Sequence, residues 1–171
     1  MSSDISYKTG EGTFNYRVGG VALHNGKVLL VTDERFNFWF PPGGKATLLE
    51  PSDKTLQREV FEELGVSPTI ERVLWTTESM FYLEYWKGNV HEMTILYLIS
   101  FPKEASIYSL ESGTGDEEVD GKTISLKFRW FDIDKLVNMI PPFLKKALKN
   151  IPPHPEHFII NELEKQPARK S

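Results

Sequence analysis

The chain has 171 residues, 40% of them hydrophobic, which suits one folded domain with a sizeable core. It contains no cysteine, and this excludes disulfides, thiolate catalysis and cysteine-ligated metal sites. Its formal net charge of −4 argues against nucleic acid polymers as partners, because binding them requires a basic face. We therefore expect a single domain over residues 1–171.

The N-terminal part predicts a loose start followed by a hairpin. Residues 1–15 are polar and contain glycine, so we expect a loosely held arm or a short edge strand. They lack the basic and apolar regions of a signal peptide, and no run of the chain reaches the roughly 18 apolar residues of a membrane span. We expect a cytoplasmic protein without a membrane partner. Strands are predicted over 16–23 and 27–32, joined by a tight turn at Asn25-Gly26.

Aromatic residues crowd the next stretch. Four of them within five positions are more than one strand face can bury, so we expect at least one to face a cleft: Phe36, Phe38, Trp39 and Phe40. For each residue taken singly, core packing is the alternative. Arg35 is a candidate phosphate contact, and the alternative for this residue is a solvated side chain.

The pattern after residue 50 predicts a helix. It begins near Ser52 or Asp53, either of which can cap it, and ends at Gly65, which can adopt a left-handed conformation. Three glutamates project from one face of this helix: Glu59, Glu62 and Glu63. Because like charges on one face repel, these side chains require either full solvation or a bound cation.

Fixed spacings around this helix favour the bound cation. Five residues separate Gly44 from Glu50, and seven more separate Glu50 from Arg58. The sequence continues with further residues of a single pattern: Glu59, Val60, Glu62, Glu63, Gly65 and Val66. All nine positions match the Nudix signature GX5EX7REUXEEXGU, where U is aliphatic, so the chain resembles a Nudix hydrolase over residues 39–66. One departure is Leu49, where many members have glycine, and we expect a differently shaped loop there.

The second half of the chain contains the remaining strands. They are predicted over residues 69–77, 80–86, 91–101 and 123–131. Glu92 and His91 stand at a strand end from which they could reach the site, although a lone histidine is more often structural. Residues 103–123 predict a long, acidic, glycine-rich loop.

The C-terminal part predicts two more helices. Pro141-Pro142 begins the first, whose apolar stripe should cover the sheet face opposite the acidic helix. The second is a short helix over residues 158–165, so that 152–171 forms a C-terminal helical tail.

The resemblance implies a fold and a set of ligands. The expected fold class is α/β, an α/β/α sandwich with a mixed β-sheet between helices. The expected cofactor is Mg²⁺ or Mn²⁺, bound by carboxylates and by the backbone carbonyl of Gly44; the carboxylates are Glu59, Glu62 and Glu63. Arg58 would orient a glutamate by ion pairing, and Glu50 would support the loop or a water on the metal.

The resemblance leaves the general base open. In the family it is either a box glutamate or an acid from elsewhere, so Glu59 is the first candidate. The second is an acid of the 116–120 segment: Glu117, Glu118 or Asp120. A solvated loop is the alternative for that segment.

The implied activity is hydrolysis of a phosphoanhydride bond in a nucleoside diphosphate linked to another group. The substrate would be a small molecule, and the oligomeric state stays open, since homodimers are common in the family. An alternative function is a sensor of the same fold that binds a nucleotide derivative without cleaving it. Such a sensor is expected to lose box carboxylates, and this chain retains all of them.

Overall fold

Residues 3–84, 86–119, 122–136 and 138–165 are described in the computed structural model, apart from the side chains of 116–119, 122 and 165. Strands predominate and helices are few. In chain order the elements are β1 Ser6–Lys8, β2 Thr13–His24, β3 Lys27–Asp33, α1 Ser52–Leu64, β4 Thr69–Leu83, β5 Gly88–Ser100, η1 Ser106–Tyr108, β6 Ser112–Val119, β7 Lys122–Asp132, η2 Ile133–Lys135, α2 Leu144–Ala147, β8 Glu156–Asn161 and η3 Leu163–Lys165.

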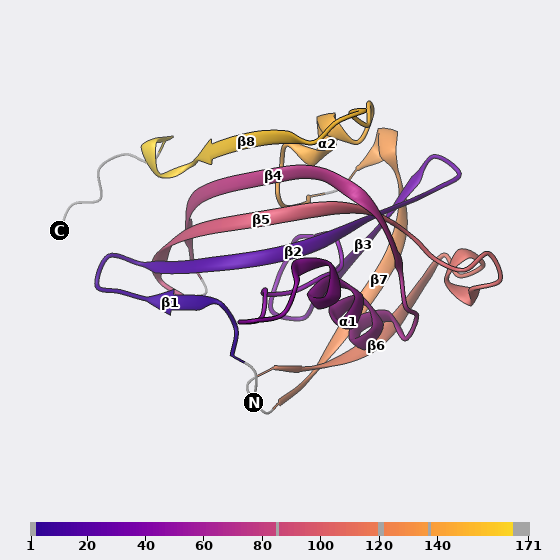
Figure 1. Cartoon of the computed structure of the whole chain (residues 1–171), viewed down its shortest axis with the longest axis horizontal. Coiled ribbons are helices and arrows are strands. Elements are labelled where there is room, and N and C mark those ends of the chain that lie inside the picture. The colour runs from indigo at the N-terminus through magenta and orange to yellow at the C-terminus, as the bar shows by residue number, and fades with distance from the viewer. Residues whose placement is uncertain (1–2, 85, 120–121, 137, 166–171) are drawn as a thin grey trace.

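The strands form one mixed sheet (Figure 1). Their order is β6-β7-β3-β2-β5-β4-β8, and β1 pairs with β2 outside this path. β2 runs parallel to β5, and β4 runs parallel to β8, whereas the other pairs are antiparallel. This arrangement confirms the predicted mixed sheet.

The hairpin between β2 and β3 separates two parts of the sheet. Asn25 and Gly26 have φ values of 49° and 74°, as a tight hairpin turn requires, and confirm the predicted turn. Only two residue pairs join β2 to β3 beyond it. Residues 42–46 lie along the rest of this β2 edge. The Gly20 N–H donates to the Pro42 carbonyl over 2.8 Å, and the Val18 N–H donates to the Gly44 carbonyl over 2.9 Å. The glycine loop of the signature is therefore fixed to the sheet.

Each face of the sheet has its own core. On one face α1 buries Leu56 and Val60 against Val18 and Tyr97. On the other face, residues 139–151 supply Leu144 and neighbouring apolar side chains. The predicted helix over this second face exists as the four-residue α2, so irregular chain provides most of that layer.

The ends of α1 differ in how they are capped. Gly65 adopts φ 69° and donates its N–H to the Phe61 carbonyl over 2.8 Å, as predicted. At the other end Pro51 is the N-cap residue and no side chain caps the helix, so the predicted cap at Ser52 or Asp53 is wrong. Ser52 is instead hydrogen-bonded to the Tyr97 hydroxyl over 2.7 Å, which ties the start of α1 to β5.

Three segments differ from the predicted secondary structure. Residues 69–83 form one long strand, β4, because two register shifts bend it without ending it. Residues 156–161 form β8 and not the start of a helix, because β4 offers them a parallel pairing edge. Within the helical tail predicted over residues 152–171, the described residues contain one helical element, the short 3-10 turn at 163–165.

The acidic segment before β7 is also different from the prediction. Residues 112–119 form β6 and pair with β7, where a loop was expected. Its glycines permit close packing: a Cβ on Gly113 would collide with the Phe128 ring, and a Cβ on Gly115 would collide with the Glu63 carbonyl. β6 therefore passes directly beside the C-terminal half of α1.

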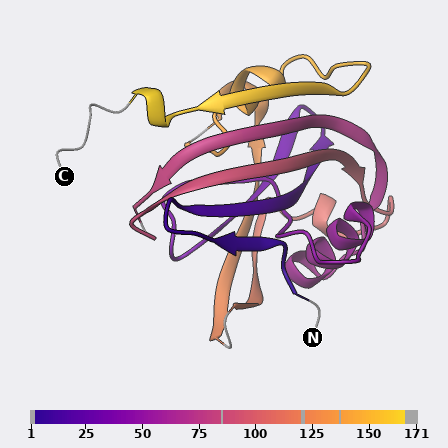
Figure 2. The ribbon, with the colours of Figure 1, turned by 60° about the vertical axis from the view of Figure 1, so that its left-hand side comes forward.

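The residues before β2 include a short edge strand. β1 pairs with β2, and Asp4 forms an isolated bridge with Thr47, so residues 4–8 are held by the sheet. The β1–β2 and β4–β5 hairpins end side by side at the same end of the molecule in both ribbon views (Figures 1 and 2). Among the described residues, no helix is long and apolar enough to cross a membrane.

Candidate active site

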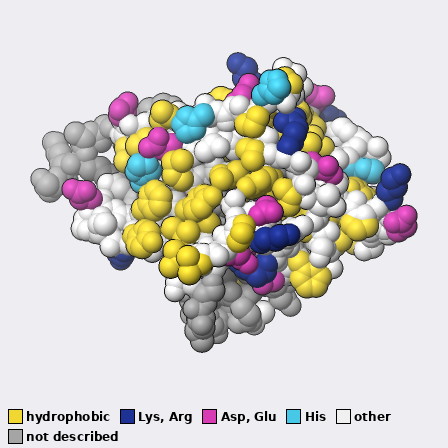
Figure 3. All heavy atoms as spheres, in the orientation of Figure 1, with side chains coloured by type: hydrophobic (Ala, Val, Ile, Leu, Met, Phe, Trp, Pro, Cys, Tyr) yellow, Lys and Arg dark blue, Asp and Glu magenta, His cyan; other side chains and the backbone are white. Residues whose placement is uncertain are grey.

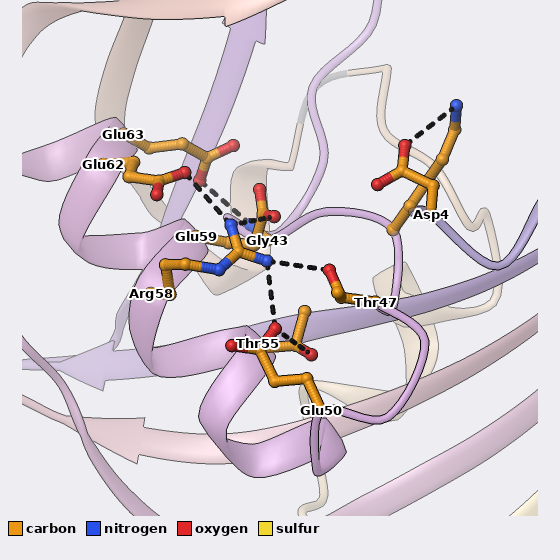
Figure 4. Close-up of polar contacts among 10 residues, drawn as sticks. Asp4, Gly43, Thr47, Glu50, Thr55, Arg58, Glu59, Glu62 and Glu63 are labelled. Carbon is orange, nitrogen blue, oxygen red and sulfur yellow. Dashed lines mark hydrogen bonds and ion pairs between the residues drawn. The ribbon is translucent and has the colours of Figure 1, made fainter. Parts of the chain in front are cut away.

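Arg58 links the carboxylates of the site (Figure 4). One terminal nitrogen lies 2.7 Å from Glu59 Oε1 and 3.2 Å from Glu62 Oε2, and the other lies 3.1 Å from Glu50 Oε2. The second nitrogen also donates to Thr47 Oγ1 over 3.1 Å. Burial lowers the pKa of Arg58, but its hydrogen bonds to Glu50 and Glu59 outweigh this and raise it, so the guanidinium is charged at any ordinary pH.

Glu50 connects the loop before α1 to the helix itself. Its Oε2 accepts hydrogen bonds from Arg58 and, over 2.9 Å, from the hydroxyl of Thr55. The hydrogen bond from Arg58 is the main cause that lowers the pKa of Glu50. Glu50 is therefore a carboxylate that holds the loop against the first turns of α1.

Glu59 and Glu63 lie against the glycine loop. The Glu59 side chain is 15% exposed, and burial raises its pKa although Arg58 opposes the shift. Its carboxylate packs where a Cβ of Gly44 would stand, so a larger residue at that position would displace it. Glu63 is buried, and its Oε2 accepts the Gly43 N–H over 2.9 Å. The two glutamates therefore meet the loop at consecutive residues.

Both glycines are required by local geometry. Gly43 has φ 141°, a conformation that other residues rarely adopt, and a Cβ there would collide with the Val18 carbonyl oxygen. The Gly44 carbonyl accepts one hydrogen bond from Val18, which leaves one of its two lone pairs for a further partner. A metal ligand role for that carbonyl is therefore compatible with its pairing in the sheet.

The donor set has the chemistry that a hard divalent cation prefers. Carboxylates and a backbone carbonyl supply only oxygen, and the missing Cβ of Gly44 leaves room for Glu59. Yet no three acidic or histidine side chains among the described residues converge on a ready-made metal site. Glu62 and Glu59 instead share Arg58, and Glu63 bonds to Gly43, because unneutralised carboxylates separate and pair with donors. The oxygen ligands are of the type that a divalent cation requires. The glutamate side chains would have to rotate before they could bind the same ion.

Leu49 occupies the position at which many members of the family that the sequence resembles carry glycine. Its φ is 67°, a left-handed conformation that glycine adopts without strain. The side chain is 97% exposed, so it contributes no packing that would offset this strain. The loop therefore holds a leucine in a backbone conformation suited to glycine.

The other sequence candidates occupy varied positions. Arg35 forms a bidentate ion pair with the buried Asp33, with its Nε and a terminal nitrogen at 2.9 and 2.8 Å. His91 lies 3.0 Å from Glu78 on an exposed part of the sheet. Phe36 stacks on Phe38 at a ring separation of 4.9 Å. These contacts explain each side chain without reference to a substrate.

The acids of the β6–β7 hairpin are only partly described. Glu117 and Glu118 belong to β6, but their side chains lie outside the described residues, as does the whole of Asp120. The backbone of β6 reaches α1 at Gly115, beside the Glu63 carbonyl. These acids stay candidates for the base.

The sequence did not single out Arg17 beside the site. Arg17 opposes the rise that burial causes in the pKa of Glu59, and it has the same effect on the pKa of Glu92. Arg17 lies on β2 and Glu92 on the neighbouring parallel strand β5. Arg17 pairs there with Thr94, two residues after Glu92. No signature position marks Arg17, and only the alternation of side chains along β2 could have suggested its orientation.

Comparisons with known proteins agree on one family. A model of the NUDIX domain matches residues 13–152. RNA pyrophosphohydrolase from Orientia tsutsugamushi (strain Boryong) is 27% identical over 145 residues, which cover 80% of this chain and 87% of that protein. A MutT NUDIX hydrolase from Burkholderia pseudomallei superposes with a TM-score of 0.56 at 22% identity, covering 81% of this chain and 98% of that one. An ADP-ribose pyrophosphatase from Streptococcus suis superposes with a TM-score of 0.50 at 19% identity. The match covers 85% of this chain and 98% of that one.

Proposed function

Because the chain belongs to the Nudix hydrolase family, we propose that it hydrolyses a phosphoanhydride bond in a nucleoside diphosphate linked to another group, with Mg²⁺ or Mn²⁺ as cofactor. The observation that carries the proposal is the meeting of Glu59 and Glu63 with the Gly43-Gly44 loop. Neither a solvated acidic face nor a purely structural helix requires that close approach.

The proposed ligands are oxygen atoms from the helix and the loop: the carboxylates of Glu59, Glu62 and Glu63 and the carbonyl of Gly44. A divalent cation there would neutralise phosphate charge and lower the pKa of a bound water. Glu63 is already oriented by the Gly43 N–H, and Arg58 holds Glu59 and Glu62 on the same side of α1. These contacts keep the three carboxylates close to the glycine loop, and side-chain rotation would bring them onto a shared cation.

The proposed base is Glu59. Burial raises its pKa, which makes it a better proton acceptor than an exposed carboxylate, and Arg58 restricts its orientation. The acids of the β6–β7 hairpin are the alternative: Glu117, Glu118 and Asp120. The backbone of Glu117 and Glu118 continues along β6 from Gly115, where a Cβ would collide with the Glu63 carbonyl, so this strand runs beside α1.

A substrate panel tests the proposal. Release of phosphate or nucleotide would be measured with Mg²⁺ on ADP-ribose, nucleotide sugars, dinucleoside polyphosphates and oxidised nucleoside triphosphates. A 5′-triphosphorylated oligonucleotide belongs in the panel because one relative is named an RNA pyrophosphohydrolase. We expect turnover of at least one compound and its loss in excess chelator. Turnover that persists in excess chelator would contradict the metal requirement.

A further inference from the structure

An open cleft lies at the end of the sheet where the β1–β2 and β4–β5 hairpins meet. Its volume is about 740 Å³, within the range of small-molecule sites. The two hairpins are tied at their tips, where Asn89 Nδ2 donates to the Glu11 carbonyl over 3.4 Å. A Cβ on Gly12 would stand 2.6 Å from the Asn89 carbonyl oxygen, so glycine is needed for this approach. The cleft is therefore formed by tertiary contact between two separate hairpins.

The cleft is basic in a protein whose net charge is −4. Its lining includes Lys8, Lys45 and Lys87 but a single acid, Glu11, among the described side chains. Lys45 lies 3.6 Å from Asp4, while neither Lys8 nor Lys87 forms an ion pair with a described residue. The ammonium groups of Lys8 and Lys87 therefore give this hollow a positive charge that an anionic ligand would neutralise.

One residue that lines the cleft, Lys45, adjoins the glycine loop of the candidate active site. Lys45 directly follows Gly44, and its bridge with Arg17 on β2 places both side chains on one face. Towards the start of β2 the same face carries Thr13 and its pairing partner on β1, Lys8. Arg17 lies four positions after Thr13 in the strand, a span of about 14 Å at about 3.4 Å per residue. A ligand at the glycine loop could therefore extend along β2 into the cleft.

Aromatic side chains complete the lining. Trp86 is 45% exposed and Tyr82 is half-buried, and both border the cleft beside Lys87. Exposed rings next to lysines fit a group that combines phosphate with a flat base, since bases stack on aromatic faces. In the space-filling view, hydrophobic side chains form a broad band across the middle of the molecule, and Lys, Arg, Asp and Glu side chains lie beside it (Figure 3).

We propose that this cleft binds a nucleotide unit of the substrate beyond the bond that is cleaved, with its phosphate near the lysines and its base against Trp86. This inference rests on the proposed function, because it assigns to that reaction a substrate carrying a further nucleotide. The unit could come from the second nucleoside of a dinucleoside polyphosphate or from the next nucleotide of a 5′-triphosphorylated oligonucleotide. Both present the same chemistry to the cleft.

Binding without turnover gives the first test. The affinity of 5′-phosphorylated diadenylate would be measured by calorimetry in chelator, for the wild type and for Lys8→Gln, Lys87→Gln and Trp86→Ala. We expect each lysine change to weaken binding roughly three- to ten-fold and to reduce the slope of log affinity against log salt by about 0.7. Trp86→Ala should weaken it by roughly five-fold or more.

The matched control is Lys103→Gln, which removes an exposed lysine outside the cleft. It should bind the dinucleotide as the wild type does. Unchanged affinity in all the cleft variants, or an equal loss in Lys103→Gln, would overturn the proposal. Thermal melts would establish that the variants remain folded, and the surface positions of Lys8 and Lys87 make this the expected result.

Kinetics then identify the source of the nucleotide unit. In Lys8→Gln and Lys87→Gln, the KM should rise for diadenosine tetraphosphate or for 5′-triphosphorylated diadenylate, with kcat retained and the KM for ATP unchanged. The substrate whose KM rises is the source. An equal rise for ATP, or no rise for either extended substrate, contradicts a role in substrate binding. If no substrate is hydrolysed, the proposed function fails, and the binding measurement alone decides whether the cleft takes a nucleotide.

Discussion

The acidic site around Arg58 and the basic cleft between the hairpins hold charge in opposite ways. In the acidic site the Arg58 guanidinium forms ion pairs with three carboxylates, and the buried Glu63 carboxylate accepts a hydrogen bond from a backbone N–H. In the cleft, Lys8 and Lys87 have no ion-pair partner among the described residues. Charges fixed by hydrogen bonds should control rate and stability, whereas solvated charges should control affinity and its salt dependence.

Turnover should distinguish the two regions most strongly. Glu59→Gln keeps the side-chain volume but removes charge and basicity, so kcat should fall by about 10²–10⁴-fold. Glu104→Gln, which changes an exposed acid elsewhere, and Lys8→Gln should retain kcat. Steady-state kinetics on any active substrate give the comparison.

One pattern of results would move the base to another acid. If Glu59→Gln retains near-full activity while Glu118→Gln or Asp120→Asn loses it, the base lies in the β6–β7 hairpin.

Stability should be the next largest difference. Arg58→Gln leaves three carboxylates without their guanidinium, and we expect a loss of about 1–2 kcal/mol at pH 7 after allowance for partial exposure. Lys8→Gln should change the free energy of unfolding by less than about 0.5 kcal/mol. Urea denaturation at pH 7 measures both, and equal small effects would remove the distinction between fixed and solvated charge.

The Arg58 effect should depend on pH with a definite sign. Arg58 lowers the pKa of Glu50 in the folded state, so this stabilisation is present above the unfolded pKa of about 4.3. It is lost as the pH falls through the folded pKa, because Glu50 then takes up a proton. The difference between wild type and Arg58→Gln should therefore shrink between pH 5 and pH 3. A constant difference over that range would contradict the ion-pair account.

The smallest expected effect concerns the loop that connects the two regions. Leu49→Gly should raise the free energy of unfolding by about 0.5–1 kcal/mol, because it relieves a left-handed leucine and removes no packing. Leu48→Gly is the control, since Leu48 is also exposed but lacks a positive φ. Thermal or urea melts would show it, and a destabilised Leu49→Gly would mean that this backbone is not strained.

Local signals predicted much of the fold because their physical causes are local. The turn at Asn25-Gly26 and the end of α1 at Gly65 depend on residues that tolerate positive φ. The helix predicted over residues 158–165 is wrong because the strand conformation of β8 depends on pairing with β4, far away in sequence. The predicted loop is wrong over β6 because Gly113 and Gly115, which are typical of turns in a sequence, permit close contact with Phe128 and Glu63 here.

The site shows the same division. Helical spacing placed Glu59, Glu62 and Glu63 on one side of α1, and their contacts with Arg58 and Gly43 are local to the signature. Arg17 comes from another strand and reaches the site through strand register, which no spacing in the sequence reveals. The cleft likewise forms where separate hairpins touch.

The central claim is that the glutamates of α1 form a metal site, and thermal melts with and without Mg²⁺ at fixed ionic strength test it most directly. Wild type should be stabilised by about 2.7 kcal/mol at a hundredfold excess over Kd. Glu63→Gln, whose amide oxygen can still accept the Gly43 N–H, should gain much less, while Glu104→Gln should gain as much as wild type. Small and equal shifts in all three proteins would contradict the metal assignment.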